Sequence, residues 1–332
     1  MLKFGRRETL KMALTAPFVL AGGRSSTQAW AQGGWPNRPV QIIMPFGAGG
    51  AADTASRVVF QRVSEILGQP MIIENRTGGA SVVAASAVLN MPKDGYAFFI
   101  NSSQQMITPI FVKDLPFDFK TAFVPVTKLA NYPQVVAMKQ DFPAKTIEEL
   151  IAYAKANPEK LRYATPPAAG PGHMAGTLIQ LRTGTKWVHI PYRVTPEAAR
   201  DVAAGSVDVA IITTSTIRPV HEAGKVRILA VTSAKRAKIH PTVPTIAETI
   251  IPGFELDDWA GIFATTGTPE PIIARMQGAI AEAAKDPAVV AKLSPFGTEI
   301  IGNSPAEFGK FVEDQRTVLT GIIKEANITT AG

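Results

Sequence analysis

The sequence predicts an α/β protein in which strands alternate with helices along most of the chain. Three observations carry this prediction: apolar strand-like runs recur from residue 39 onward, segments of helical period separate them, and a glycine-rich turn joins the first strand to the first helix. Strands separated by helices of this length are typical of parallel βαβ units covered on both faces. With 332 residues, 46% of them hydrophobic and 18% charged, the chain is long enough for two domains with their own cores.

The first part of the chain contains three strands, each followed by a turn or loop. A β-branched run begins at Val40 and ends at Pro45, the turn 47–50 follows, and an Ala-rich helix comes next. Further strands are expected at 70–75 and 96–101, with a small-residue helix at 79–90 between them. The polar loop 101–105 follows the third strand at its carboxyl end, the edge where open α/β sheets bind ligands.

The rest of the chain repeats this pattern. The expected elements are a helix at 146–156, a strand at 161–165, a small-residue loop at 166–172 opening a helix at His173, a strand at 188–190, a helix at 196–204, strands at 207–212, 226–232 and 261–265, and helices from Pro269, Pro287 and Ser304. A Pro-rich stretch at 241–254 is a plausible return crossing.

Two α/β halves with a middle insertion require two crossovers, which we expect near Ala130 and near Gly253. Residues 32–131 and 253–332 would then form one domain, and residues 132–252 the other. One cleft and one hinge fit a monomer most simply.

The glycine turn Gly47-Ala48-Gly49-Gly50 is the strongest indication of a ligand. A strand, a glycine turn and a helix together place unpaired backbone N–H groups and a positive dipole end at one spot, where α/β proteins hold anions. Its spacing matches neither the dinucleotide nor the nucleoside-triphosphate fingerprint, which favours a smaller anion. The loop 166–172 has similar character, so a dicarboxylate could bridge two helix N-termini. Close strand–helix packing is the alternative explanation of each turn.

Several side chains near these turns have two interpretations. Asp53, in the first turn of its helix, is either a cap or a partner for a ligand ammonium, hydroxyl or water. His173 is either a ligand contact or a local hydrogen-bond partner. Tyr192 and Arg193 follow a strand and could line a cleft, although arginine is usually a surface residue. Trp259 is interpreted as a core residue.

The N-terminal 31 residues are predicted to be an export signal. They combine a charged start, an apolar stretch at 12–23 and the small-x-small sequence Ala29-Trp30-Ala31, which predicts cleavage near Ala31 and a mature start at Gln32. The pair Arg6-Arg7 leaves both the Sec and the twin-arginine route open. No second apolar run reaches membrane-spanning length, so we expect no membrane-embedded segment in the mature, exported protein.

Charge and composition exclude several classes of function. The net charge of +7 includes +4 from residues 1–31 (five basic residues against one acid), and no basic run with interleaved aromatic residues predicts nucleic-acid binding. The chain has no cysteine, which excludes disulfides, thiolate metal sites and cysteine nucleophiles. The four histidines lack metal-binding spacing and no G-x-S-x-G motif occurs, so neither a metal, a cofactor nor an enzyme is predicted.

The chain resembles the receptors of tripartite tricarboxylate transporters, also called Bug receptors, from about Trp35 to Ile328. The matching pieces are W-P-N-R-P-V at Trp35, P-F-G-A-G-G-A-A-D at Pro45, L-G-Q-P-M-I-I-E-N-R-T-G-G at Leu67, P-K-D-G-Y at Pro92, G-H-M-A-G at Gly172, V-H-I-P-Y at Val188, A-V-T-S-A-K-R at Ala230, V-P-T-I-A-E at Val243 and P-G-F-E at Pro252. The resemblance implies a two-domain periplasmic binding protein fold of type II, each domain a mostly parallel sheet flanked by helices, which closes on a small carboxylate in the interdomain cleft.

The resemblance also implies where the ligand binds. The glycine loop and the residues that follow it would hold one carboxylate through backbone groups and ordered waters, and the loops after later strands would form the remaining wall. Together with the residues singled out above, the candidate ligand-binding residues are Phe46, Gly47, Ala48, Gly49, Gly50, Ala51, Asp53, Ser102, Ser103, Ala169, Gly170, Pro171, Gly172, His173, Tyr192, Arg193 and Thr213.

The chain departs from the family pattern in the second domain. Arg193-Val194 stands where the family often has Lys-Gly, Ile212-Thr213 where it commonly has Asp-Asn, and the usually Ser-rich loop is Pro167-Ala168-Ala169-Gly170-Pro171. Because these changes remove polar groups, we expect an aromatic or short aliphatic acid, or a dicarboxylic acid, in preference to citrate. The implied partner is a membrane permease of one large and one small subunit. Two alternatives stay open: a sensor for a membrane kinase, and a hydrolase using the same cleft.

Overall fold

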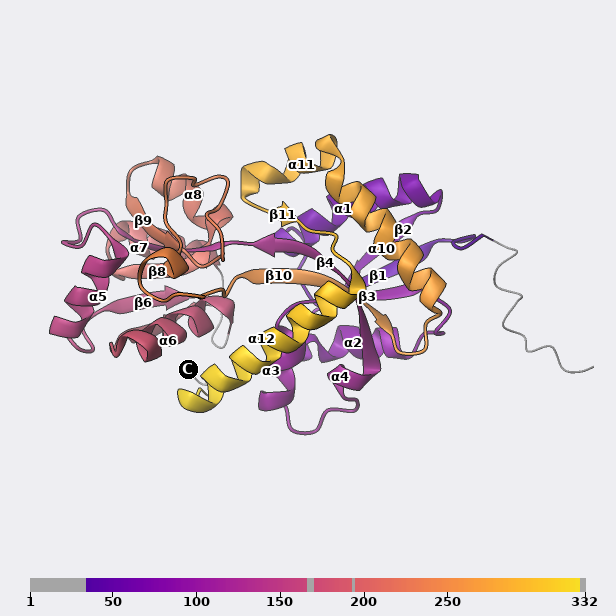
Figure 1. Cartoon of the computed structure of the whole chain (residues 1–332), viewed down its shortest axis with the longest axis horizontal. Helices are drawn as coiled ribbons and strands as arrows, with labels where there is room; N and C mark the ends of the chain where they lie inside the picture. The colour runs from indigo at the N-terminus through magenta and orange to yellow at the C-terminus, as the bar shows by residue number, and fades with distance from the viewer. Residues whose placement is uncertain (1–33, 166–169, 193–194, 329–332) are drawn as a thin grey trace, which may run out of the picture.

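The computed structural model describes residues 34–165, 170–192 and 195–328. Two sheets lie at opposite ends of the long axis, and β4 and β10 run between them through the middle of the molecule (Figure 1). The long C-terminal helix α12 (Pro305–Glu325) crosses below these two strands. None of the helices in the described ranges combines the length and the apolar character needed to cross a membrane.

The first sheet has six strands in the order β11-β4-β10-β3-β1-β2. They are β1 (Val40–Met44), β2 (Met71–Asn75), β3 (Ala97–Asn101), β4 (Phe123–Tyr132), β10 (Asp258–Thr265) and β11 (Glu299–Ile300). β1 runs parallel to β2 and β3, whereas β10 is antiparallel to β3 and β4, and β11 is antiparallel to β4. Its helices are α1 (Ala51–Leu67), α2 (Val82–Leu89), α3 (Gln104–Phe111), α4 (Phe119–Ala122), α10 (Glu270–Lys285), α11 (Pro287–Leu293) and α12, with short 3₁₀ turns η2 (Gly79–Ser81) and η3 (Ser294–Phe296).

The second sheet has five strands in the order β7-β6-β8-β5-β9. They are β5 (Gln134–Lys139), β6 (Arg162–Thr165), β7 (Val188–Pro191), β8 (Val209–Thr213) and β9 (Val226–Val231). Its helices are α5 (Ile147–Ala156), α6 (Pro171–Thr183), α7 (Thr195–Ala204), α8 (Thr214–Glu222) and α9 (Ile246–Thr249). β6 is parallel to β7 and β8, while β5 is antiparallel to β8 and β9.

Both faces of the first sheet are buried, which explains why β1 is a nearly continuous apolar run. Ile42 packs with Phe60 of α1 and Ile280 of α10 on one face. Ile43 faces the opposite way, into a cluster that reaches Tyr163 of the second sheet and Leu319 of α12. Helix α12 therefore contributes to a core that extends under both sheets.

The predicted α/β class with two sheets is confirmed, but the sheets are mixed and not mostly parallel. The chain leaves the first sheet along β4 and returns along β10, and strands that run out and back must lie antiparallel to each other. The sequence reading assigned no strand to β4 or β5. The crossovers lie at Pro133, between β4 and β5, and in residues 232–257. The domain boundaries at 131/132 and 252/253 stay predictions.

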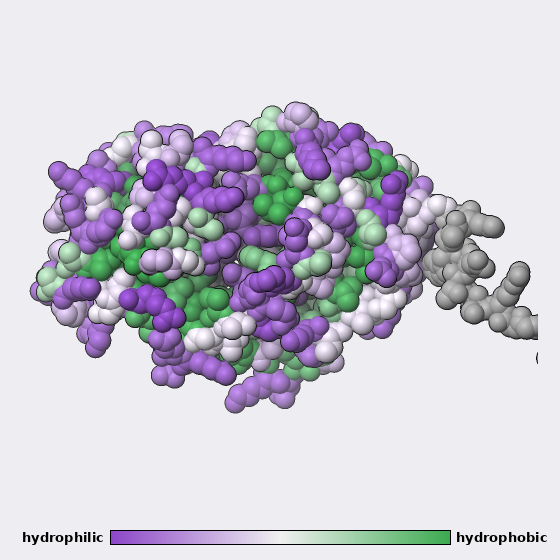
Figure 2. Space-filling model, viewed as in Figure 1, coloured by the Kyte–Doolittle hydropathy of each residue, from purple (hydrophilic) through white to green (hydrophobic). Residues whose placement is uncertain are grey.

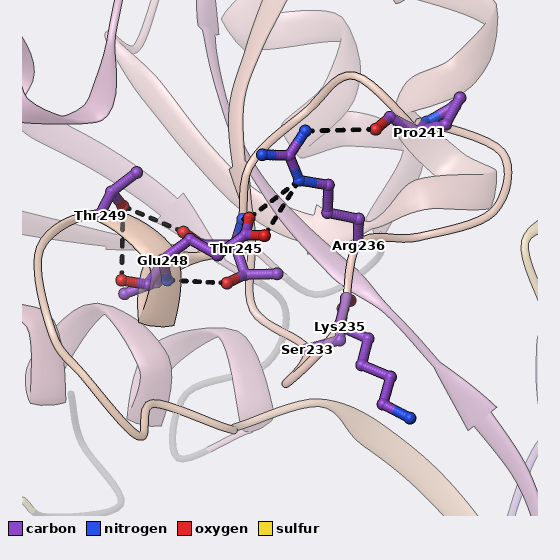
Figure 3. Close-up of polar contacts among 8 residues, drawn as sticks. Ser233, Lys235, Arg236, Pro241, Thr245, Glu248 and Thr249 are labelled. Carbon is purple, nitrogen blue, oxygen red and sulfur yellow. Dashed lines mark hydrogen bonds and ion pairs between the residues drawn. The ribbon is translucent and has the colours of Figure 1, made fainter.

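The return segment is a folded loop held by polar contacts around Arg236 (Figure 3). The Arg236 Nε donates to both carboxylate oxygens of Glu248 at 2.9 and 3.1 Å, and its Nη1 donates to the Pro241 carbonyl at 3.4 Å. Thr245 and Glu248 form a capping box, in which Glu248 N donates to the Thr245 hydroxyl and Thr245 N donates to the Glu248 carboxylate. These contacts fix the Pro-rich stretch against the start of α9.

Candidate functional site

A cavity of about 940 Å³ lies between the two sheets and takes its walls from both. Its volume is in the range of small-molecule sites, at the upper end of roughly 300–1,000 Å³. The first-sheet side is formed by the glycine turn, the start of α3 and the residues around η3, and the second-sheet side by the first residues of α6, α7 and α8. Over α11 and β11 the surface shows a hydrophobic patch (Figure 2). Phe296, the last residue of η3, is 50% exposed and lines the cavity.

Five helices begin at the wall of this cavity. Four have their N-cap residue there, Gly50 of α1, Ser103 of α3, Gly170 of α6 and Thr213 of α8, and the first two residues of α7 line it as well. None of these four N-caps makes a side-chain capping hydrogen bond to its helix. The first-turn N–H groups and the positive dipole ends of several helices therefore point toward one space, which is the arrangement that binds anions.

The buried side chain of Asp53 stabilises the glycine turn through hydrogen bonds. Its carboxylate accepts hydrogen bonds from Gly49 N at 2.9 Å and from Asn75 Nδ2 at 2.9 Å, and it forms an ion pair with Arg57 at 2.9 Å. Burial acts to raise the pKa of Asp53, but the hydrogen bonds from Arg57, Gly49 and Asn75 outweigh it, so the pKa is lowered. Asn75 Nδ2 also donates to the Phe46 carbonyl at 2.9 Å.

Gly49 has φ +79°, a left-handed conformation that favours glycine. The turn is therefore specified both by backbone freedom at one glycine and by a buried carboxylate behind it.

The loop after β3 is a second polar wall of the cavity. Ser102 and Ser103 are both buried and both line it. Ser102 N donates to the Asn101 side-chain oxygen at 2.9 Å, and Gln104 N approaches the Ser102 hydroxyl at 3.4 Å. The hydroxyls of this loop are thus presented together with the N-terminus of α3.

The floor of the cavity is made where β4 and β10 leave the first sheet. Tyr132, the last residue of β4, is the cross-strand partner of Asp258, the first residue of β10. Both line the cavity together with Trp259. Burial raises the pKa of Asp258 to about 6, although a hydrogen bond from Trp259 N opposes the shift. Burial, and then the nearby Asp258 charge, raises the pKa of Tyr132.

Most of the predicted site residues that the structure describes lie at this cavity. Those that line it are Phe46, Gly47, Gly49, Gly50, Ala51, Ser102, Ser103, Gly170, Pro171 and Thr213. Those that do not are Ala48, Asp53, Gly172, His173 and Tyr192. Ala169 and Arg193 lie outside the described residues. Ligand contact by any of them stays a prediction.

Besides Asp53, three of the residues away from the cavity wall have identified neighbours. The His173 ring stacks on the His189 ring at 3.9 Å between centroids, and burial lowers the pKa of each to about 4. The Tyr192 hydroxyl donates to Asp201 at 2.8 Å. Gly172 packs so closely that a Cβ there would lie 2.4 Å from the Ile211 carbonyl oxygen.

The sequence analysis missed a further group of lining residues. They are Pro45, Ala52, Thr54, Gln104, Ile107, Tyr132, Thr195, Pro196, Ser215, Thr216, Asp258, Leu293, Phe296 and Thr298. Trp259 also borders the cavity, but its side chain is 1% exposed and packs on Phe308 and Phe311 of α12, so its interpretation as a core residue is confirmed. The hydroxyl-rich run 213–216 directly after a strand was an available signal. Within the described ranges no three histidine or acidic side chains gather closely enough to bind a metal ion.

The chain matches the family model described as tripartite tricarboxylate transporter family receptor over residues 55–328. It is 35% identical over 302 residues to a UPF0065 protein from the tcbD–tcbE intergenic region of Pseudomonas sp., covering 91% of this chain and 88% of that one. It is also 29% identical to protein BugT of Bordetella pertussis, covering 88% of this chain and 90% of BugT.

Two of the solved structures to which the chain is similar were solved with a carboxylate. A protein of R. palustris, solved with adipate, is 33% identical, with a TM-score of 0.76 and coverage of 89% of this chain and 99% of that one. MatC of Rhodopseudomonas palustris, solved with malate, is 25% identical, with a TM-score of 0.71 and coverage of 87% and 100%. The chain therefore belongs, as its motifs predict, to the receptors of the tripartite tricarboxylate transporter family, and it is a receptor and not an enzyme.

Proposed function

We propose that this protein is an exported receptor that captures a small carboxylate in the cavity between its two sheets. The observation that supports this most strongly is the convergence of uncapped helix N-termini on a cavity that no described lysine, arginine or histidine lines. Backbone N–H groups at helix starts bind a carboxylate without a basic side chain, and each charge-assisted hydrogen bond contributes roughly 1.5–3 kcal/mol.

The relatives support the same ligand class, because one was solved with adipate and another with malate. In this chain the carboxylate would bind at the glycine turn and the loop after β3. Residues 32–131 with 253–332, and residues 132–252, would close over it as two domains, with the crossovers at Pro133 and in residues 232–257 as hinges. The remaining predicted contacts, Gly172 and His173 among them, would act from the second domain.

The lining of the cavity favours a ligand with an apolar body. Phe46, Tyr132 and Phe296 contribute aromatic side chains to it. An aromatic or short aliphatic acid would bury its hydrocarbon part against these rings. Citrate, with carboxylates on every side, would leave charged groups against apolar walls.

The proposed context is transport across the inner membrane. Residues 1–31 would direct export to the periplasm and be removed near Ala31, and the closed, loaded monomer would deliver its ligand to a two-subunit permease. The family description supports this partner, since its receptors serve tripartite tricarboxylate transporters.

A thermal-shift screen of the protein starting at Gln32 tests the proposal. Mono-, di- and aromatic carboxylates are compared with their primary amides, which keep the shape and lose the charge. A ligand at 100 times its dissociation constant adds about 2.7 kcal/mol of stability, which for a chain of this size is a rise of several degrees. The expected result is a rise with one class of acid, none with its amide, and recovery of the acid unchanged.

Mass spectrometry of small molecules released on denaturation checks whether the site is already filled. Equal shifts with acids and amides, or no shift together with no released acid, would contradict the proposal.

A further inference from the structure

The cavity contains one charged side chain among the residues that the structure describes, and it is an acid. Asp258 lines the cavity, and no lysine, arginine or histidine in the described ranges does so. For a receptor whose ligand is a carboxylate, an isolated acid in the binding cavity is unfavourable unless the ligand brings something to it. A like charge in a partly desolvated cleft opposes binding of an anion.

The carboxylate of Asp258 makes few polar contacts with the residues that the structure describes. One of its oxygens accepts the backbone N–H of Trp259 at 2.9 Å, and no ion pair with a described residue is formed. Asp258 is partly exposed, and it lines the cavity. Its second carboxylate oxygen is therefore available to a ligand.

Tyr132, the cross-strand partner of Asp258, also has a polar group without a hydrogen-bond partner among the described residues. The Tyr132 side chain is only 5% exposed and lines the cavity, yet its hydroxyl has no hydrogen-bond partner among the described residues. Buried hydroxyls in folded proteins almost always have a partner, so an orphaned one at a cavity wall indicates a ligand group or water that would complete it. The register Asp258↔Tyr132 places the two groups side by side at the cavity floor.

We infer that Asp258 and Tyr132 form a subsite for a ligand ammonium group, so that the preferred ligand is an amino-bearing carboxylate with no net charge. The inference rests on the proposed function, because the helix N-termini hold the carboxylate end of that ligand. Asp258 supplies the counter-charge and an acceptor, and the Tyr132 hydroxyl oxygen supplies a second acceptor.

The surroundings of the subsite suit a cation. The Tyr132 ring lies at the same floor as Asp258, and Phe46 belongs to the wall beside the glycine turn. The faces of such rings attract ammonium groups. A dicarboxylate would instead place its second negative charge in a cavity where the described side chains offer it an acid and no base.

Calorimetric titration with length-matched pairs of ligands tests the inference. Each pair has an ω-amino acid and the dicarboxylate of the same carbon number, from β-alanine and malonate to 6-aminohexanoate and adipate, with 4-(aminomethyl)benzoate and terephthalate as the aromatic pair. For the length that fits, the amino member should bind at least about tenfold more tightly, the effect of one hydrogen bond to a charged group.

Three variants assign the preference to the subsite. Asp258→Asn should weaken binding of the amino member at least about tenfold and strengthen binding of its dicarboxylate, which reverses the ranking. Tyr132→Phe should weaken the amino member severalfold. Asp141→Asn removes the same charge from an exposed turn away from the cavity and should change neither.

The inference is overturned if wild-type protein binds the dicarboxylates more tightly, if Asp258→Asn weakens both members of a pair equally, or if the acid released from purified protein contains no amino group. In each of these cases the carboxylate receptor proposed above still stands. If no acid binds in either series and none is released, the proposed function itself fails. Should Asp258→Asn not fold, the wild-type ranking and Tyr132→Phe decide the question.

Discussion

Replacing Asp53 with alanine is expected to weaken carboxylate binding without removing any atom from the cavity wall. Asp53 is 2% exposed and does not line the cavity, but its carboxylate holds Gly49 N and Asn75 Nδ2, each at 2.9 Å. The alanine variant leaves both donors without this acceptor. The glycine turn then has to be ordered by the ligand, so part of the binding free energy is lost.

The size of the effect follows from the contacts. Two charge-assisted hydrogen bonds to a buried carboxylate contribute roughly 1.5–3 kcal/mol each, so Asp53→Ala should lower the free energy of unfolding by about 3 kcal/mol. The ion pair with Arg57 adds little, because the Arg57 side chain is 49% exposed. If ordering the turn costs about 1.4 kcal/mol at the moment of binding, the dissociation constant rises about tenfold.

The assay combines urea unfolding with calorimetric titration of the acid identified in the thermal-shift screen. Asp53→Asn keeps one of the two acceptor oxygens and should fall about halfway between wild type and Asp53→Ala. Glu148→Ala is the matched control, because Glu148 is an exposed acid in the first turn of α5, away from the cavity.

Removing the negative charge of Asp53 alone favours an anion at the N-terminus of α1 by about 0.3–1 kcal/mol. An unchanged or improved affinity in Asp53→Ala would therefore refute the positioning role. A change in which acids bind, without a general weakening, would show instead that Asp53 contacts the ligand.

Gly172→Ala places a Cβ 2.4 Å from a backbone oxygen of β8 and should lower the unfolding free energy by about 2 kcal/mol. The control is Gly278→Ala, whose Cβ would have no atom within 4 Å and should not lower the unfolding free energy. Urea unfolding of the two variants checks this difference. The stacked rings of His173 and His189 have pKa values of about 4 in the folded protein. Between pH 6.5 and 4, therefore, these two side chains take up protons only in the unfolded chain. Stability is therefore lost as the pH falls through that window, by about 2 kcal/mol per ring at pH 5. In His189→Gln the loss of unfolding free energy between pH 7 and 5 should be smaller by the contribution of one ring, about 2 kcal/mol. The same loss in the variant and the wild type would contradict this. Thr232→Val removes the hydroxyl that donates to Asp257 at 2.7 Å and should cost about 1–3 kcal/mol in unfolding experiments, while Thr232→Ser should retain most of the stability.

The elements that the sequence predicts well are those with local signals. Helix α5 follows Thr146, whose hydroxyl accepts Glu149 N at 3.2 Å, and α12 follows Ser304, the first residue of a capping box. The strand at Val40 is recognisable because both faces are buried and nearly every residue is apolar. In each case a few adjacent residues determine the outcome.

Strand β4 lacks such signals. Thr127, Lys128 and Asn131 interrupt the apolar pattern of β4, although all three are buried. Two of them are buried because residues far away in the sequence interact with them. The Lys128 ammonium lies 3.9 Å from the centre of the Phe311 ring, and Asn131 Nδ2 donates to Asp257 at 2.7 Å. A polar strand of this kind resembles a loop until its partners are known.

The same distinction explains which parts of the site were predictable. Backbone donors at a glycine turn are a property of one short segment, so Gly49 and Gly50 could be recognised from their neighbours alone. Tyr132 and Asp258 have no motif, since they meet only through the antiparallel pairing of two strands that are far apart in the chain. Main-chain N–H groups can bind a carboxylate without help from particular side chains. The ability to bind a carboxylate is therefore a general property of such a cleft. What distinguishes one ligand from another must therefore come from side chains like Tyr132 and Asp258, at the ends of β4 and β10.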